Sequence, residues 1–264
     1  MATSRAMNKH SSIAAFAKSS ILVLIIIHIT LIAHAVPEDT SNRNTCLVFD
    51  GVDDYVEVSD GIGFNFGAGD SFTVVVRAKS GTNNRVLLDR GREASPYVGY
   101  AIGYGTEESN RITFELGDGV NTSTATSTTR LEGNELLYIV GVRNASARKV
   151  RIYINDMLED EQDDLTGDLS NTQILSIGSN SKQNVGTFFK GYVCDVRIYN
   201  RALSMNEVIW IYTGNYSNTN GLVLWLKMDE GVGEICADSS GEGNNGTIVG
   251  ASWLTPPEST PTPT

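Results

Sequence analysis

Histidine is almost absent from this 264-residue sequence, and its few copies are confined to one end. His10, His28 and His34 all lie within the first 35 residues, so the rest of the chain contains no imidazole. Histidine is the usual proton carrier near neutral pH and the commonest metal ligand. Its absence excludes Ser-His-Asp hydrolases, Cys-His hydrolases and His-ligated zinc enzymes as functions of residues 36–264.

Positive charge is also in short supply. The chain has 20 lysines and arginines against 31 aspartates and glutamates, which gives a formal net charge of −11. Arg5, Lys9 and Lys18 lie in the first 35 residues, and removing these three charges takes the net charge from −11 to −14. An acidic surface repels phosphate backbones, which argues against a nucleic-acid partner, and it attracts hard cations such as calcium.

No apolar run is long enough to cross a membrane comfortably. The longest extends from Ile21 to Ile32, interrupted only by His28 and Thr30, whereas a spanning helix needs roughly 20 apolar residues. Basic residues precede this run, and Ala33-His34-Ala35 follows it as a small-x-small cleavage pattern. We predict that residues 1–35 are a signal peptide and that the mature protein is extracellular or at the cell surface, with no membrane span. The alternative is an uncleaved N-terminal anchor.

Cysteine is scarce too, with three copies at Cys46, Cys194 and Cys236. In an exported chain we expect one disulfide and one free thiol. Three pairings are possible, and the spacing does not choose between them. The alternative is that all three are small buried hydrophobic residues.

What the sequence does contain is alternation of apolar and polar residues between about residues 46 and 200. Phe72, Val74, Val76 and Ala78 share one face of a predicted strand. The same alternation recurs at residues 136–142, 150–154 and 192–198. Many half-buried strands separated by turn residues, with no βαβ pattern, are typical of an antiparallel two-sheet jelly-roll sandwich. We therefore predict an all-β fold.

One short helix is predicted near residues 204–213. Ser204 and Glu207 form a capping box, and Gly214 can end the helix. The apolar stripe that would pack against the rest of the protein consists of Met205, Val208, Ile209 and Tyr212.

Two segments carry a resemblance to a known family. Residues 47–56 (LVFDGVDDYV) are similar to the first strand and hairpin of laminin-G-like, concanavalin A-like jelly-roll modules. Residues 189–204 (FKGYVCDVRIYNRALS) are similar to the closing strand and helix start of that family. The resemblance covers about residues 46–214 and implies a jelly-roll sandwich that binds ligands outside the cell.

The order of segments differs from the usual family order at the C-terminal end. Residues 221–253 resemble the segment that usually precedes the FDG strand. We infer that residues 221–254 supply strands that close one sandwich spanning residues 46–254, because an unfilled edge would leave backbone groups unpaired. The alternative is a second module cut short. Residues 36–45 form a polar lead-in, and residues 255–264 (TPPESTPTPT) form an extended Pro/Thr-rich tail.

The resemblance also implies a structural calcium ion at the rim of the sandwich. At the matching positions the oxygen donors are Asp50, Asp53, Asp54 and the carbonyl of Gly51, and Asp195 could contribute from the closing strand. Calcium takes six to eight such oxygens. Many members of the family carry aspartate at the position of Cys194, so this chain departs from the pattern there. The alternative is that Asp53 and Asp54 only make a tight turn.

Lectin-like sandwiches often bind sugars through exposed aromatic and polar side chains. The candidates here lie opposite the predicted core faces or in a glycine-rich strand: Tyr100, Tyr104, Tyr153, Arg197 and Tyr199. The alternative for each is a cross-strand pair on an exposed sheet, which stabilises by about 0.2–1 kcal/mol.

The acidic run Glu159-Asp160-Glu161-Gln162-Asp163-Asp164 raises the question of catalysis. Consecutive acids would occupy both faces of a strand, which a buried strand does not tolerate, so we predict a solvated loop. The chain is therefore not expected to be an enzyme. We predict a secreted or cell-surface module that binds carbohydrate or mediates adhesion. The alternatives are a non-catalytic structural or protein-interaction domain of an envelope or matrix and, more remotely, a polysaccharide hydrolase.

Overall fold

The computed structural model describes residues 45–59, 63–80, 86–91, 97–104, 110–131, 135–184 and 186–254. The predicted signal peptide (1–35), most of the lead-in and the predicted tail (255–264) lie outside these ranges. Within the described ranges, no helix is both long and apolar enough to cross a membrane.

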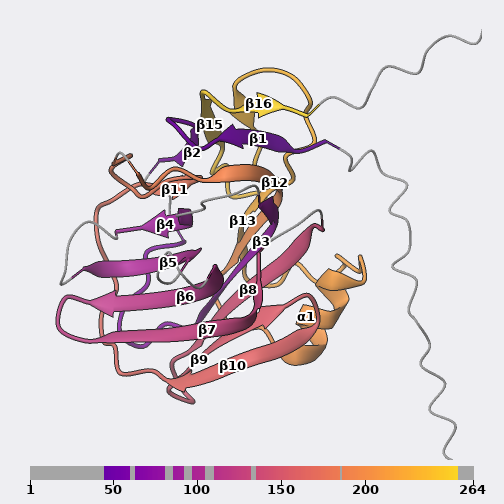
Figure 1. Ribbon diagram of the computed structural model, residues 1–264. Helices are drawn as coiled ribbons and strands as arrows, with labels where there is room; N and C mark the ends of the chain where they lie inside the picture. Colours follow the sequence, from indigo (N-terminus) through magenta and orange to yellow (C-terminus); the bar gives the residue numbers. More distant parts are fainter. Residues whose placement is uncertain are drawn as a thin grey trace, which may run out of the picture. The chain divides into compact units, whose positions relative to one another are not determined.

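The strands form two antiparallel sheets (Figure 1), which confirms the predicted all-β sandwich with one short helix. Sheet A has the order β10 (Met157–Asp163), β9 (Lys149–Ile154), β8 (Leu137–Asn144), β3 (Phe72–Ser80), β12 (Lys190–Tyr199), β1 (Leu47–Asp50) and β16 (Ser252–Trp253), and β13 (Leu222–Leu226) also pairs with β12. Sheet B has the order β14 (Ile235–Cys236), β15 (Gly246–Val249), β2 (Tyr55–Val58), β11 (Leu175–Ile177), β4 (Val86–Arg90), β5 (Val98–Tyr104), β6 (Arg111–Asp118) and β7 (Thr122–Arg130).

The main hydrophobic core lies between the two sheets. The alternation in β3 places Phe72, Val74 and Val76 in this core, as the sequence predicts. Phe72 stacks on Phe66 with ring centroids 4.1 Å apart, and Phe114 of sheet B meets it edge-on at 5.9 Å. Interdigitating aromatic side chains thus join the two layers at this point.

A second hydrophobic layer lies on the other face of sheet A, under the helix α1 (Met205–Tyr212). The capping box of Ser204 and Glu207 is present as predicted. The predicted stripe is wrong in part, because Val208 and Ile211 are buried whereas Met205 is 51% exposed. The buried members of this layer are Val75, Tyr138, Val140, Val142, Tyr153, Tyr199, Leu203, Val208, Ile211 and Leu222.

The strands after the helix join both sheets. β13 pairs with β12 and β16 pairs with β1 in sheet A, whereas β15 pairs with β2 in sheet B. Residues 222–253 therefore contribute strands to both layers, and the turn between β15 and β16 lies next to β1 and β2 (Figure 1).

One disulfide joins the start of β1 to β12. Of the three pairings that the sequence leaves open, the structure has Cys46–Cys194, and Cys236 is a buried free thiol. Leu47 pairs with Val193, so the two cysteines lie opposite each other at the start of β1. The disulfide thus holds the first strand of the fold to its closing strand.

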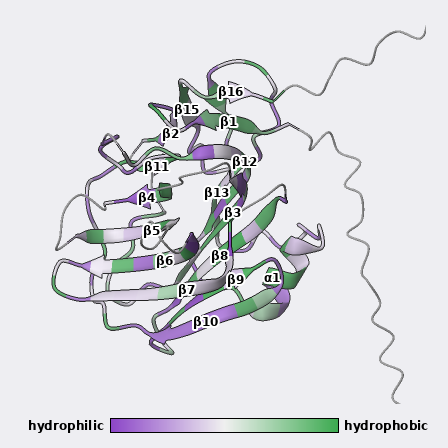
Figure 2. Ribbon diagram, viewed as in Figure 1, coloured by the Kyte–Doolittle hydropathy of each residue, from purple (hydrophilic) through white to green (hydrophobic). Residues whose placement is uncertain are grey.

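The prediction of a solvated loop over the acidic run is wrong in part, because the run is largely exposed as predicted but most of it lies in β10, an edge strand of sheet A. Figure 2 shows this strand as hydrophilic along most of its length. Carboxylate oxygens of Glu159 accept hydrogen bonds from the backbone N–H groups of Thr128 and Thr129 at 2.8 Å, and Asp160 accepts one from Thr126 at 2.8 Å. These side chains satisfy backbone donors of β7, the edge of the other sheet, which an unpaired edge would otherwise expose.

Candidate functional site

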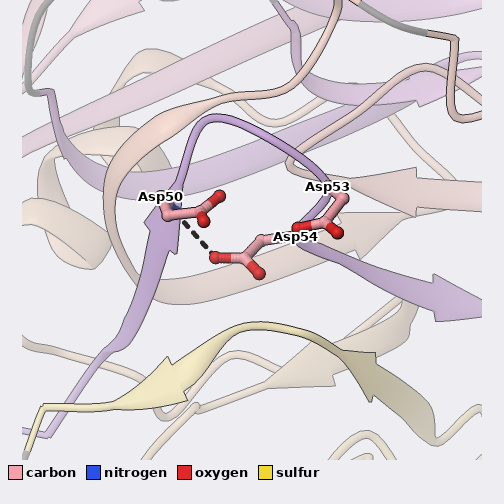
Figure 3. Close-up of side chains that lie close together, drawn as sticks. All are labelled: Asp50, Asp53 and Asp54. Atoms are coloured by element: carbon pink, nitrogen blue, oxygen red, sulfur yellow. Dashed lines mark hydrogen bonds between the residues drawn. The ribbon is translucent and has the colours of Figure 1, made fainter.

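The acidic rim is the loop between β1 and β2, which carries Asp50, Asp53 and Asp54 (Figure 3). Asp50 Oδ1 accepts a hydrogen bond from the N–H of Val52 at 2.7 Å, which turns the chain directly after β1. Asp54 Oδ2 accepts one from the N–H of Asp50 at 2.7 Å and closes the loop. Carboxylate oxygens of the three aspartates all lie within 4.8 Å of one another.

Gly51 is required by the shape of this loop. Its φ of +84° lies in the left-handed region that favours glycine. A Cβ atom at this position would also stand 2.8 Å from the Cβ of Lys190 on β12. A side chain here would therefore distort the loop that groups the three carboxylates.

The electrostatics of the rim favour a bound cation. Asp50 and Asp53 are exposed, whereas Asp54 is 6% exposed. Burial raises the pKa of Asp54; the N–H of Asp50 opposes this shift, and the negative charges of Asp50 and Asp53 add to it. A cation among the three carboxylates would offset both the burial and the mutual repulsion.

The donor set fits calcium. Two oxygens that contact the same calcium ion, each about 2.3–2.6 Å from it, can stand up to about 5 Å apart. The three carboxylates meet this condition, and only one oxygen of Asp50 and one of Asp54 accept the backbone hydrogen bonds described above. The carbonyl of Gly51 belongs to the same loop and is a further oxygen donor.

Asp195, the fifth predicted calcium ligand, is not part of this group, and that prediction is wrong. Its side chain is 2% exposed, and its two oxygens accept hydrogen bonds from Nε and Nη2 of Arg197 at 2.8 and 2.6 Å. The physical reason is that Asp195 pairs with Arg77 in the middle of sheet A and shares the face of Val75, which the second hydrophobic layer covers.

Sequence reasoning missed one residue that borders the rim, Gly250. A Cβ atom at Gly250, in the turn after β15, would stand 2.3 Å from Asp54 Oδ1. The C-terminal segment therefore borders the acidic loop, and glycine permits the approach. A glycine after a short apolar run signals a turn, but nothing local in the sequence connects it with Asp54.

The predicted exposure of Tyr100 is wrong. Its side chain faces the main core and is 1% exposed. The hydroxyl donates a hydrogen bond to the carbonyl of Phe64 at 2.9 Å, and the ring lies 4.9 Å from that of Phe72. Burial raises the pKa of Tyr100 further above its usual range. Tyr104 ends β5, and its side chain lies outside the described residues.

The other three predicted ligand residues are also buried, so their expected exposure is wrong. Tyr153, Arg197 and Tyr199 are 4%, 1% and 2% exposed. They lie on the outer face of sheet A, as the alternation predicts, but α1 and the segment after it cover that face. The guanidinium of Arg197 stacks on the rings of Tyr216 and Trp225, at 4.1 and 4.4 Å from their centroids.

A small pocket that the sequence analysis did not identify lies beside α1, where residues of the covered face meet the segments on either side of the helix. It is lined by Tyr199, Arg201, Leu203, Glu207, Trp210, Ile211, Asn215, Tyr216 and Asn218. Trp210 is 44% exposed. The available signal was that Trp210 falls outside the predicted apolar stripe and is followed by the polar segment Asn215–Asn220.

Glu207 makes the stability of this region dependent on pH. Its hydrogen bond from Arg201 and those from Ser204 lower the pKa of Glu207 from 4.5 to about 2, against the opposing effect of burial. The pKa is thus lower in the folded than in the unfolded state. The ionised form therefore stabilises the fold above the unfolded value, and this contribution is lost as the pH falls towards about 2.

We expect Glu207→Gln to weaken the acid dependence of stability. Glutamine keeps one acceptor oxygen for the capping bond from Ser204, but it has no charge and its NH2 group cannot accept the bonds from Arg201 and Asn218. The difference in unfolding free energy between wild type and variant should be about 1–2 kcal/mol at pH 6, after allowance for solvent screening, and should vanish towards pH 2. Urea unfolding across this pH range measures it. Asp118, whose pKa is also about 2, is present in both proteins and contributes equally to their acid dependence. If the unfolding free energies of the two proteins differ by the same amount at every pH, Glu207 is not the source of that dependence.

Comparisons with known proteins agree with this architecture. A laminin G family model, described as concanavalin A-like lectin/glucanases superfamily, matches residues 50–209. A candidate carbohydrate-binding protein from Bacteroides ovatus shares the fold with a TM-score of 0.63 and 18% identity, over 80% of this chain and 59% of its own. A heptameric SAP-like pentraxin from Limulus polyphemus aligns with a TM-score of 0.51 and 12% identity, over 67% of this chain and 83% of its own. The chain thus spans about three fifths of the length of the Bacteroides protein. No curated protein sequence matches it significantly.

Proposed function

The chain belongs to the laminin G family of the concanavalin A-like lectin/glucanases superfamily, and on that premise we propose that it is a non-catalytic module that binds carbohydrate, or mediates adhesion, outside the cell. The observation that carries the proposal is the group of three carboxylates on the exposed loop between β1 and β2. The likeness to the candidate carbohydrate-binding protein from Bacteroides ovatus supports the same class of function, although at 18% identity it extends to the fold alone.

The ion that we propose at the rim is calcium, held by Asp50, Asp53, Asp54 and the carbonyl of Gly51. Calcium accepts six to eight oxygens, more than this loop supplies, so positions remain for water or for hydroxyl groups of a sugar. The roles of the chain are to hold the loop in shape through the two backbone hydrogen bonds to Asp50 and Asp54 and to keep the three carboxylates close together.

The state of the acidic run supports a non-catalytic function. Glu159 and Asp160 accept backbone hydrogen bonds from β7, and Glu161 and Asp163 pair with basic side chains on β9. Paired carboxylates that cleave a glycosidic bond must face a sugar site, one of them with a raised pKa. These carboxylates instead fasten one sheet edge to its neighbours.

Export is supported by two features. Residues 1–35 have the pattern of a signal peptide. The Cys46–Cys194 disulfide belongs to a class of bond that persists mainly in oxidising environments outside the cytosol. We therefore propose an extracellular or cell-surface location.

The test is a glycan array probed with the secreted protein in calcium and in chelator. We expect binding that the chelator abolishes, and a calcium dissociation constant of about 10⁻⁴–10⁻³ M, as in other extracellular modules. Asp53→Asn should weaken calcium binding by about tenfold or more, because it removes one of three charged ligands. Asp163→Asn is the matched control, since it removes the same charge from an exposed residue of β10 and should leave both affinities unchanged.

Other outcomes would favour the alternatives. Capture of a protein from the envelope or matrix, with no glycan bound, would indicate a structural or protein-interaction domain. Hydrolysis of a polysaccharide that disappears on replacement of Glu159 and Glu161 would indicate a hydrolase.

A further inference from the structure

The pocket beside α1 has the composition of a ligand site of its own. It is lined by residues before, within and after α1, and its volume of about 10 Å³ has room for about one water molecule, so a larger ligand would lie across its mouth. In Figure 1, α1 stands beside β8–β10, whereas β1 and β2, which the acidic rim joins, lie at the top of the view. A ligand at this pocket would therefore bind independently of the rim.

Trp210 supplies an aromatic platform at the mouth of the pocket. Trp210 is 44% exposed, which places it among the exposed large apolar residues of the part of the chain that the structure describes. Tyr216 lines the pocket with it, and the hydroxyls of Tyr216 and Tyr138 lie 3.0 Å apart in a hydrogen bond that fixes the Tyr216 ring. Aromatic faces of this kind pack against the C–H groups of a sugar ring.

A network centred on Glu207 holds the polar wall in place. Glu207 Oε1 accepts hydrogen bonds from Nη2 of Arg201 and Nδ2 of Asn218, both at 2.7 Å. Glu207 Oε2 accepts bonds from the N–H and hydroxyl of Ser204, both at 2.8 Å. Arg201 Nε donates to the carbonyl of Asn220 at 2.7 Å. A wall fixed in this way loses little freedom when a ligand binds.

Donor groups remain for a ligand. Asn215 Oδ1 accepts bonds from the N–H and hydroxyl of Ser217, whereas its Nδ2 group has no acceptor among the described residues. Arg201 uses Nε and Nη2 in the network, and its Nη1 group likewise has no acceptor in the part of the chain that the structure describes. Both groups can donate to hydroxyl oxygens of a sugar.

The charge of the pocket limits the class of sugar. Arg201 and Glu207 are the oppositely charged residues of the lining, and they pair with each other at 2.7 Å. The site is therefore close to neutral, within a protein whose formal net charge is −11. Neither feature attracts a sulfated, sialylated or uronic sugar.

We propose that the surface around this pocket is a second site, on which the ring of a neutral sugar packs against Trp210, with Asn215 and Arg201 as hydrogen-bond donors. The choice of a sugar rests on the proposed function, but the site requires no calcium. Its binding should therefore resist a chelator, which distinguishes it from binding at the rim.

The experiment measures binding of neutral and acidic oligosaccharides in the presence of chelator, by calorimetry and on the array. The protein is produced in a host without N-glycosylation, because Asn215-Tyr216-Ser217 is an acceptor sequence. We expect neutral sugars to bind, Trp210→Ala to weaken them by about tenfold or more, and Trp210→Phe to retain much of the affinity. Met205→Ala is the matched control, since Met205 is an exposed apolar residue of the same helix outside the pocket lining.

The outcomes separate the two sites. Chelator-resistant binding that Trp210→Ala abolishes supports the pocket even if the rim binds nothing. Binding that the chelator and Asp53→Asn both abolish, and that Trp210→Ala leaves intact, overturns the pocket and supports the rim. Preference for acidic sugars in chelator also overturns it. Absence of any glycan binding overturns both proposals.

Discussion

Replacing Cys46 and Cys194 together with alanine lowers the free energy of unfolding by about 3–5 kcal/mol. The two cysteines are 148 residues apart, so their bond removes a large loop-closure entropy from the unfolded chain. In the folded protein it joins β1 to β12 beside their first pair, Leu47 and Val193. Alanine is preferable to serine because both cysteines are buried and a hydroxyl there would need a new hydrogen-bond partner.

Urea unfolding of the oxidised wild type, the reduced wild type and the double variant measures this effect. Reductant should bring the wild type close to the double variant and should leave the variant unchanged. Cys236→Ala is the matched control, because it removes a buried thiol that forms no disulfide and should cost about 1 kcal/mol. A double variant no less stable than Cys236→Ala would show that the bond does not stabilise the fold.

The sequence was sufficient for the parts of the fold that depend on local pattern. Alternation in β3 identified Phe72, Val74 and Val76 as core residues, and the capping box located the start of α1. These features were predictable because each depends on side-chain direction or hydrogen bonding within a few residues.

β12 shows where local pattern fails. Strict alternation places Cys194 on the same face as Val196 and Ile198. In the structure Val193 and Val196 both join the main core, because the register with β3 shifts between Val193 and Asp195. Such a bulge adds one residue to a strand without any characteristic residue type, and both faces of β12 are buried here.

The covered face of sheet A explains the failed ligand predictions. Charged and tyrosine side chains opposite a core face normally indicate a solvated sheet surface. Tyr153 and Tyr199 instead lie beneath α1, and the charge of Arg197 is matched by Asp195 within the same layer. Which face a later helix covers depends on contacts between distant segments, so the sequence pattern alone does not determine it.

The surroundings of the acidic rim also combine a local feature, which the sequence reveals, with a contact between distant segments, which it does not. Asp50, Asp53 and Asp54 could be grouped from the sequence because they lie within five consecutive residues, at the end of β1 and in the tight loop after it. The contact of Gly250 with Asp54 depends on how β15 and β16 dock on β2 and β1. The acidic run in β10 is a related case, since its carboxylates find their donors on a strand of the other sheet.

Arg197→Met is expected to lower the free energy of unfolding by about 3–5 kcal/mol, because it removes the cation that donates two hydrogen bonds to the buried carboxylate of Asp195. The side chains of the pair are 1% and 2% exposed. The variant also loses the stacking of the guanidinium on Tyr216 and Trp225. Urea unfolding monitored by circular dichroism measures the loss.

A double variant that also removes the carboxylate of Asp195 separates the net contribution of the ion pair to stability from the cost of removing one partner alone. Asp195→Leu/Arg197→Met should recover most of the lost stability, because well-packed apolar residues often replace a buried ion pair at little cost. Arg151→Met is the matched control on the same sheet, since its pair with Glu161 is partly exposed and should contribute only about 0–1 kcal/mol. If the double variant is no more stable than Arg197→Met, the loss comes from the stacking of Arg197 on Tyr216 and Trp225 and not from the broken ion pair with Asp195. In that case the second layer depends on the aromatic contacts of Arg197, and Tyr216→Ala should reproduce the loss while both charges remain.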